Sequence, residues 1–318
     1  MFPDRRCHCD APLENHTLSA VLGYPVLPRA GLANMLIPWA ECYLWCQDQG
    51  VERLSPIWTK ARVGPRLRRE RDPRQYQRLF SAGTQITGLR RLALLATARR
   101  VSADRWRDGW ARLPTNRSTL VCFNDMNHFE RLVGRHREVG AELVRMTRPQ
   151  YRPPSLDGPF IGVHVRMGDY PPRGEGPTQL VFRLPLSWYT AGLQELRRAL
   201  GEDLPAIVFS DGTDSELGPL LALRNVQRSP FATAITDLLA LSAGAAIVTS
   251  RSTFSLWAAY LGQIPALWFP PKADICGRGV FPGDQGIELE IEWQPGDDLP
   301  RPFVAAVRQR CGSVRAGH

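Results

Sequence analysis

Residues 237–261 read DLLALSAGAAIVTSRSTFSLWAAYL. An apolar strand pattern at residues 245–249 ends in a polar turn, and helical patterns lie on either side at residues 235–241 and 254–261. The order strand, turn, helix is the repeating unit of a parallel α/β sheet. Further strand patterns occur at residues 160–165, 206–209 and 266–269, and further helical patterns at residues 188–200 and 217–223. The C-terminal half is therefore predicted to form a doubly wound parallel sheet.

The N-terminal half has the same alternation in weaker form. Strand patterns occur at residues 25–27 and 120–123, and helical patterns run from Gly31 to Gln49 and from Phe129 to Met146, with Asn127 as a cap. A stretch rich in Pro and Gly at residues 149–159 predicts a linker. We therefore expect an N-terminal domain of residues 1–155 and a C-terminal domain of residues 156–318.

The composition is that of a soluble globular protein. Of the 318 residues, 43% are apolar and 22% are charged, which excludes wholesale disorder. No run approaches the roughly 18 consecutive apolar residues of a membrane span, and residues 1–20 lack the apolar core of a signal peptide. Seven scattered cysteines predict free thiols. We therefore expect a cytoplasmic protein.

The net charge of +9 is concentrated in one segment. Arg supplies 38 of the 40 basic residues, which a compositional bias of the genome would explain. Residues 60–117 hold 16 basic and 4 acidic residues, whereas residues 156–318 hold 14 and 17. Halves of opposite charge argue against a surface coated for nucleic acid, and the basic segment lacks regularly interleaved aromatic residues. We therefore expect no nucleic-acid partner.

Polar residues follow three of the predicted strands, at His164–Tyr170, Ser210–Gly212 and Ser250–Ser255. Ligands of open parallel sheets bind at the carboxyl ends of the strands, so these groups mark the expected site. Ser252 and Thr253, at the start of a helix, suit a phosphate, although a simple helix cap accounts for the same hydroxyls.

Metal binding is not expected. The sequence has no Gly-rich phosphate loop and no Asp-x-Asp pair to hold a metal beside a sugar nucleotide. Glu288, Glu290 and Glu292 alternate along the chain, and a solvated edge strand is a better interpretation of them than a cation site.

The opening segment resembles the signature of the α-1,2-fucosyltransferases, glycosyltransferase family 11. That signature has an Asp, a Leu-Met-Ser, an apolar strand and Asn-Ser-x-Phe-Ser-Trp-Trp. Four further segments are similar to family motifs and follow the family's order: AGLANML at residues 30–36, FNDMNHF at 123–129, HVRMGDY at 164–170 and FSD at 209–211. The resemblance spans residues 25–270 except the basic segment.

This resemblance implies an α/β protein of the GT-B fold, with two Rossmann-like doubly wound domains facing across a cleft. It also implies GDP-fucose as donor, a glycan hydroxyl as acceptor, and inversion at the anomeric carbon without a metal or cofactor.

The resemblance further implies roles for individual residues. Arg166 would neutralise the leaving diphosphate, His164 and Asp237 would lie near the guanine, and Asp211 would hold a loop or the ribose. The other donor-binding candidates are Gly31, Asn34, Ser250, Arg251, Ser252, Thr253 and Ser255. The general base is Asp169 or Glu175, and Asp169 could instead orient Arg166.

Two positions depart from the family motifs. Met167 stands where the family has a second Arg, and Arg251 stands where it has an Asn. We expect Arg251 to restore the lost positive charge. The departures leave two alternatives open: transfer of another nucleotide sugar, and a non-catalytic module that binds a sugar nucleotide or glycan.

We expect the excess of arginine at residues 60–117 to contact the acceptor or the surface that carries it. An acidic polysaccharide would account for it, as would an anionic membrane surface carrying a lipid-linked oligosaccharide. The second interpretation predicts a peripheral location at the inner membrane surface.

Overall fold

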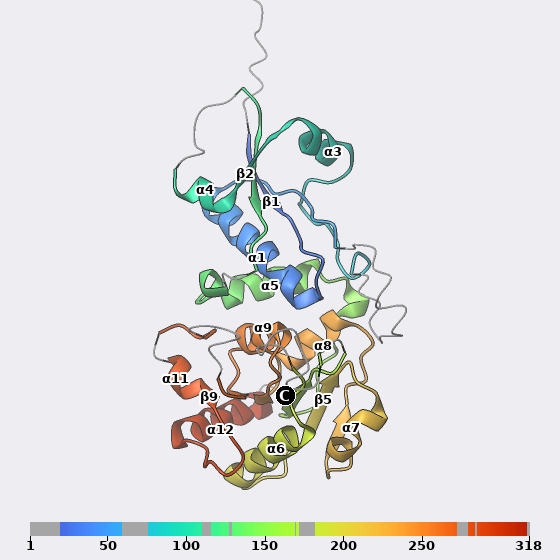
Figure 1. Ribbon diagram of the computed structural model, residues 1–318, viewed down its shortest axis with the longest axis vertical. Helices are drawn as coiled ribbons and strands as arrows, with labels where there is room; N and C mark the ends of the chain where they lie inside the picture. The colour runs from blue at the N-terminus through green and yellow to red at the C-terminus, as the bar shows by residue number, and fades with distance from the viewer. Residues whose placement is uncertain are drawn as a thin grey trace, which may run out of the picture.

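The computed structural model describes residues 20–58, 76–109, 116–126, 129–168, 170–171, 182–271, 279–283 and 285–316. Its strands form two sheets, one in each half of the chain, and all pairings within the two sheets are parallel (Figure 1). The predicted α/β class with parallel sheets is confirmed.

The N-terminal sheet has the strand order β1-β3-β2, formed by Val21–Pro25, Thr119–Phe123 and Arg99–Ser102. The strand predicted at residues 25–27 therefore begins four residues earlier. The sequence did not predict residues 21–24 as strand, because Gly23 has a low strand propensity. Glycine occurs here because a Cβ would come within 2.8 Å of the Cys42 sulfur. The close approach of a helix, and not strand propensity, selects glycine here.

The C-terminal sheet has the strand order β6-β5-β4-β7-β8-β9. Its four central strands confirm the four predicted ones, and the two edge strands were not predicted as such. The strands are β4 Ile161–Val165, β5 Ala206–Ser210, β6 Val226–Arg228, β7 Ala246–Val248, β8 Ala266–Trp268 and β9 Glu290–Glu292.

The strand of alternating glutamates is only partly as expected. β9 is indeed an edge strand, but Glu288 lies in the preceding helix α11 (Gln285–Leu289). Glu290 is only 4% exposed, and its carboxylate accepts a hydrogen bond of 2.9 Å from the Val280 N–H. The prediction of a solvated face is therefore wrong for Glu290, because a neighbouring backbone donor compensates its burial.

Helices fill the connections between the strands. In the N-terminal half they are α1 Leu32–Gln49, α3 Gly88–Thr97, α4 Ala103–Arg107, η1 Phe129–Leu132, α5 His136–Met146 and η2 Pro149–Tyr151. In the C-terminal half they are α6 Leu186–Leu200, α7 Asp214–Leu221, α8 Ala234–Leu241, α9 Thr253–Gly262, α11 and α12 Arg301–Ala316. Within the described ranges, no helix is both long and apolar enough to cross a bilayer.

The helix predicted from residue 129 to 146 is two elements. Gly134 adopts a left-handed φ of 84° between η1 and α5, which ends the first turn and redirects the chain. The cap assigned to Asn127 lies outside the described residues.

Helix α9 joins the two halves of the molecule. It follows β7 of the C-terminal sheet and lies against α1 and α5 of the N-terminal half (Figure 1). Trp257 donates a hydrogen bond of 2.7 Å from its indole N–H to the Ala33 carbonyl, and the Tyr260 hydroxyl donates one of 2.7 Å to the Leu132 carbonyl. The ring of Phe129 packs edge-on against both aromatic rings.

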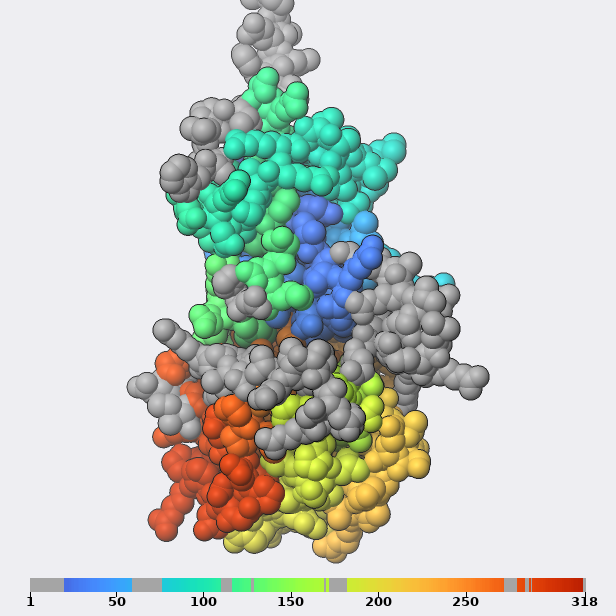
Figure 2. All heavy atoms as spheres, viewed as in Figure 1, coloured from blue at the N-terminus to red at the C-terminus, as the bar shows by residue number. Residues whose placement is uncertain are grey.

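One buried apolar cluster therefore runs through both halves. Figure 2 shows those halves as a blue-to-green mass above and a yellow-to-red mass below. The boundary expected between residues 155 and 156 falls in the connection between η2 and β4 and remains a proposal.

We predict that Tyr260→Phe destabilises the protein by about 0.5–1.5 kcal/mol, because the buried Leu132 carbonyl loses one of its two hydrogen bonds and keeps only the one of 3.0 Å from the Arg135 N–H. The change alters no other atom of the ring. Urea unfolding followed by circular dichroism measures the effect. Tyr24→Phe, which removes the same group from a half-buried ring on β1, is the matched control, and equal stability of the two variants would contradict the prediction.

Candidate functional site

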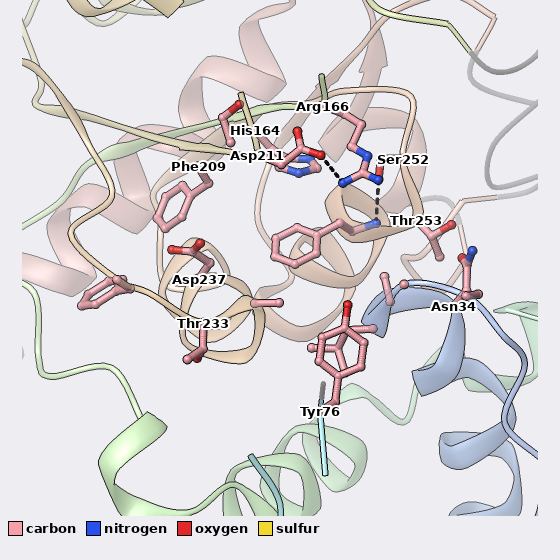
Figure 3. A pocket seen from close by; sticks show the side chains of 18 of the residues that line it. Asn34, Tyr76, His164, Arg166, Phe209, Asp211, Thr233, Asp237, Ser252 and Thr253 are labelled. Carbon is pink, nitrogen blue, oxygen red and sulfur yellow. Dashed lines mark hydrogen bonds and ion pairs between the residues drawn. The ribbon is translucent and has the colours of Figure 1, made fainter. Parts of the chain in front are cut away.

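A cavity of about 340 Å³ lies between the two halves, at the carboxyl ends of β4, β5 and β7 (Figure 3). Both halves contribute to its wall. The described lining residues are Ala30–Asn34 and Tyr76 from the N-terminal half, and His164, Arg166, Tyr170, Phe209–Asp211, Phe231–Ala234, Asp237 and Ser252–Phe254 from the C-terminal half. The expectation that polar residues after these strands meet at one edge is therefore met by this cavity.

Three helices begin at the cavity wall. The first residues of α1, α8 and α9 all line it, at Gly31–Asn34, Thr233–Ala234 and Ser252–Phe254. Helix N-termini carry unpaired N–H groups and the positive end of the helix dipole, and each attracts an anion. Gly31, the N-cap of the 18-residue α1, makes no side-chain cap. The positive ends of three helix dipoles therefore face the cavity, and Asp237 in the first turn of α8 offsets the dipole of that helix.

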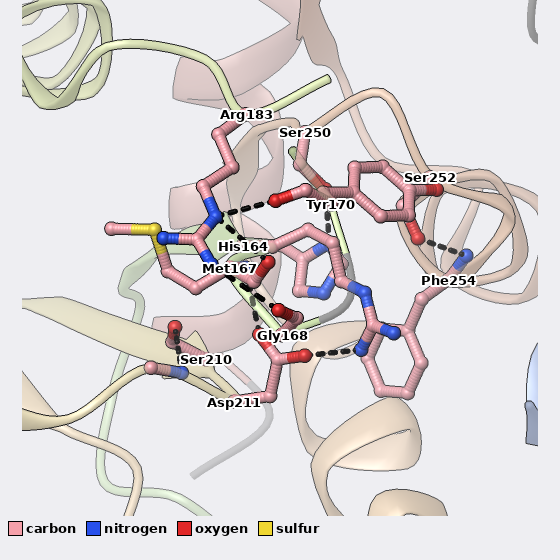
Figure 4. Close-up of polar contacts among 12 residues, drawn as sticks. His164, Met167, Gly168, Tyr170, Arg183, Ser210, Asp211, Ser250, Ser252 and Phe254 are labelled. Carbon is pink, nitrogen blue, oxygen red and sulfur yellow. Dashed lines mark hydrogen bonds and ion pairs between the residues drawn. The ribbon is translucent and has the colours of Figure 1, made fainter. Parts of the chain in front are cut away.

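An ion pair connects the residues that follow the carboxyl ends of β4 and β5. The guanidinium of Arg166 donates through Nη1 to Asp211 Oδ2, and the other carboxylate oxygen accepts a hydrogen bond of 2.8 Å from the Met167 N–H (Figure 4). The Arg166 guanidinium also lies 5.4 Å from the centre of the Tyr170 ring. The side chain is thus held in position on the cavity wall, and its partner is Asp211; Asp169, the partner considered from the sequence, lies outside the described residues.

Gly168 lets this ion pair form. A Cβ at this position would collide with Asp211 Oδ2 and would lie 3.5 Å from the guanidinium carbon of Arg166. Asp211 cannot move aside without losing its bonds to Arg166 and to the Met167 N–H. The glycine of the HVRMGDY motif is therefore required by close packing, as its φ is not in the left-handed region.

We predict that Gly168→Ala costs about 1–3 kcal/mol of stability through overpacking and also weakens anion binding in the cavity. Gly218→Ala is the matched control. Gly218 lies inside α7 with open space around it, so there the added methyl should stabilise by up to about 1 kcal/mol. Thermal unfolding of both variants measures the contrast, and destabilisation by Gly218→Ala alone would refute this account of Gly168.

His164 is fixed by the serines of the turn after β7. The hydroxyls of Ser250 and Ser255 lie 2.8 and 2.7 Å from its Nδ1, and Phe254 stacks on its ring (Figure 4). Both serines are buried and do not appear in the described cavity lining. They therefore orient His164, whose ring lies on the wall.

Burial keeps His164 neutral. It lowers the pKa of His164 to about 3, and the nearby charge of Arg166 acts in the same direction. A neutral imidazole can accept or donate a hydrogen bond to a bound ligand without adding charge.

We predict a pH dependence of stability that originates at His164. Because its pKa is lower in the folded state than in the unfolded chain, only the unfolded state gains a proton between pH 6.5 and pH 3. The folded state should therefore lose about 2 kcal/mol from this group as the pH falls from 7 to 5. Urea unfolding of the wild type and His164→Gln at both pH values tests this. The variant should lose less stability than the wild type, and parallel profiles would contradict the prediction.

The other predicted site residues, both donor-binding and catalytic, fall into three groups. Gly31, Asn34, Asp237, Ser252 and Thr253 line the cavity. Arg251 forms the second group, because it does not appear among the described lining residues. Its side chain is buried and donates a hydrogen bond of 3.1 Å to the Pro271 carbonyl. The guanidinium carbon lies 5.1 Å from the centre of the Phe182 ring. The third group, the general-base candidates Asp169 and Glu175, lies outside the described residues.

Asp237 is positioned by a neighbour on the preceding loop. Its Oδ1 accepts a hydrogen bond from the Ser229 hydroxyl, which in turn accepts one from the Phe231 N–H. Asp237 thus lies in the first turn of α8 and on the cavity wall (Figure 3). Asp237 is half-buried in this position.

Arg183 and Tyr76 are among the contributors that sequence reasoning missed. Arg183 donates from Nε to the Tyr170 and Met167 carbonyls, at 2.6 and 3.1 Å, and from Nη2 to the Gly168 carbonyl at 3.2 Å, which fixes the loop after β4 (Figure 4). Tyr76 reaches the cavity from the basic segment, where the sequence shows no regular pattern. Neither residue lies in a motif, so no local signal distinguishes them.

Metal ligands are not grouped in the part of the chain that the structure describes. No cluster of three or more His, Cys, Asp or Glu side chains there could hold an ion. Among the described residues of the cavity wall, the charged side chains are Arg166, Asp211 and Asp237.

No protein-family model and no curated protein sequence matches the chain. Among solved structures, it is similar to the NodZ α-1,6-fucosyltransferase from Bradyrhizobium crystallised with GDP, with 16% identity and a TM-score of 0.47 over 78% of this chain and 94% of NodZ. It is also similar to a mutant FUT1 of Arabidopsis thaliana with GDP, with 14% identity and a TM-score of 0.49 over 85% of this chain and 77% of FUT1. A third similar structure is POFUT1 with GDP, with 12% identity and a TM-score of 0.40 over 78% of this chain and 96% of POFUT1. At these values, the function has to be argued from the site itself.

Proposed function

We propose that this protein transfers fucose from GDP-fucose to a hydroxyl group of a glycan, with inversion at the anomeric carbon and without a metal. The single observation that supports this most is the convergence of three helix N-termini and Arg166 on one cavity between two parallel-sheet halves. A diphosphate fits that electrostatic environment, because backbone donors, helix dipoles and a guanidinium can together neutralise it. The five motif segments shared with the α-1,2-fucosyltransferases supply the choice of GDP-fucose.

The GT-B architecture is part of the same proposal. In it, the N-terminal half takes the acceptor and the C-terminal half takes the donor. Two features support it: the sheets lie in separate halves of the chain, and the cavity lies between those halves.

In the proposed donor complex, each group of the cavity wall has one task. Asp237 accepts hydrogen bonds from the N1–H and N2–H edge of guanine, with His164 as a neutral neighbour. Ser252, Thr253 and the start of α9 bind the phosphates, and Arg166 neutralises the charge that grows on the diphosphate as it leaves. Asp211 holds Arg166 at the correct angle. Gly31 and Asn34, across the cavity, bind the donor from the side of α1.

The reaction is a single displacement. The acceptor oxygen forms a bond to the anomeric carbon while the bond from that carbon to the phosphate oxygen breaks, and GDP departs with the electron pair. The proton of the acceptor hydroxyl passes to a carboxylate, for which Asp169 and Glu175 are the proposed candidates. The proposed product has an α-1,2 linkage to a galactoside, which would make the enzyme a member of glycosyltransferase family 11.

The proposed acceptor is a glycan or a lipid-linked oligosaccharide. The arginine excess of residues 60–117 supports contact of this part of the chain with an anionic membrane surface. Two alternatives follow from Met167 in the motif after β4: transfer of another nucleotide sugar, and binding of a sugar nucleotide without transfer.

Release of GDP from GDP-fucose tests the function. We expect slow release without acceptor and a marked increase when a galactose-terminated glycan is added. Tight binding without turnover on any acceptor would favour the non-catalytic alternative, and turnover only with another nucleotide sugar would replace the donor.

Calorimetric binding of GDP tests the arginine roles. Arg166→Ala should weaken GDP binding by about tenfold to a hundredfold, the usual loss of one charge-assisted contact. Arg251→Ala should have a comparable effect if it supplies the charge missing at Met167. A loss confined to Arg166→Ala would instead limit Arg251 to its packing against Phe182 and Pro271. Arg198→Ala, an exposed change on α6, is the control.

A further inference from the structure

Helix α3 (Gly88–Thr97) has apolar side chains on two opposite faces. Its inner face carries Leu94 and Leu95, which pack against a buried cluster formed by Leu22, Leu54, Ile86 and Leu120. These contacts account for the attachment of α3 to the N-terminal sheet. The outer face has no such role in the fold.

The outer face of α3 is an exposed apolar stripe. Leu89, Leu92, Ala93 and Ala96 have the spacing i, i+3, i+4, i+7 of one helix face, and all four are exposed. Leu89 is 85% exposed and Leu92 is 58% exposed, which makes them the two most exposed large apolar side chains among the described residues. Aligned leucines in water mark an interaction surface more often than scattered ones do.

Arginines outnumber acidic residues in the part of the chain that contains this stripe. Residues 76–109 contain seven Arg and only two acidic residues, Asp104 and Asp108. Arg90 follows Leu89 directly, is 61% exposed and forms an ion pair of 2.6 Å with the exposed Glu52. The exposed Arg100 reaches back to the last turn of α3, where it donates to the Leu95 carbonyl. A complementary partner surface must therefore be apolar where it contacts the leucines and negatively charged where it contacts the arginines.

We propose that the outer face of α3 docks on an anionic lipid surface. Leu89 and Leu92 enter the boundary between headgroups and acyl chains, and the flanking arginines contact lipid phosphates. This inference rests on the membrane contact proposed above and is independent of the transfer reaction.

The position of α3 suits this contact. The helix lies at the end of the N-terminal half that is remote from α8 and α9 (Figure 1). Docking there leaves the cavity between the halves open to the donor.

Charge complementarity favours lipid over a second copy of this chain. A twofold interface through α3 would bring the same arginines of both copies together, at a cost in repulsion. A lipid surface supplies phosphates at the level of the headgroups, where the arginines need them. Two leucines alone would give weak adhesion, so both the apolar and the charged component are required.

Cosedimentation with lipid vesicles tests the proposal on the full chain. We expect binding to vesicles of phosphatidylcholine with 30% phosphatidylglycerol (about one anionic lipid in three), weaker binding in high salt, and little binding to phosphatidylcholine alone. The double variant Leu89→Gln/Leu92→Gln should bind at least about tenfold more weakly, because it removes the apolar stripe but keeps every arginine and the helix propensity. Met126→Gln/Val144→Gln, which changes two side chains that are each 41% exposed elsewhere, is the matched control and should bind like the wild type.

Three outcomes would overturn the proposal: equal vesicle binding by the leucine variant and the wild type, equal binding to neutral and anionic vesicles, or a wild-type dimer in solution that the leucine variant abolishes. GDP binding by the leucine variant is measured in parallel and should be unchanged. Failure of vesicle binding with intact GDP release would thus refute the docking surface alone, and loss of GDP release with intact vesicle binding would refute the transfer reaction alone.

Discussion

The hydrogen bond from Trp257 to the Ala33 carbonyl fixes the geometry on which the site depends. Ala33 lies in the first turn of α1, and Trp257 lies in the second turn of α9. The contact therefore sets how the N-termini of the two helices face each other across the cavity. Because both partners are buried in the apolar cluster shared by the two halves, separating them would leave the indole N–H without its acceptor and expose a large aromatic surface at once.

A second constraint acts at the sheet edge. The carboxylate of Asp211 binds both the Arg166 side chain and the Met167 backbone, and Gly168 leaves the space for it. Arg183 holds the carbonyls of the same loop from the other side. The guanidinium is therefore held in one orientation, which would reduce the reorganisation needed to stabilise the proposed diphosphate leaving group. In this chain, the HVRMGDY motif therefore serves to hold the Arg166 guanidinium in this orientation.

Much of the C-terminal half could be predicted from the sequence, because buried parallel strands are continuous apolar runs and the residues after them are polar. The edge strands β6 and β9 could not, since their sequences are polar and their pairing depends on neighbours distant in sequence. Of the predicted donor-binding residues, Arg166, Asp237 and Ser252 line the cavity, whereas Ser250 and Ser255 contact His164 and do not appear in the described lining. The roles of Arg183 and Tyr76 arise only from tertiary contacts, and a sequence pattern carries no signal of those.

In the proposed complex, one GDP-sugar binds across this cavity with its diphosphate at Arg166 and the N-terminus of α9. A crystal structure of the protein with GDP tests it most directly. The account predicts diphosphate oxygens within hydrogen-bond distance of Arg166 and of the first N–H groups of α9, and the guanine edge at Asp237. GDP bound outside the cavity, or bound there with its guanine at Arg166 and its phosphates at Asp237, would contradict the claim.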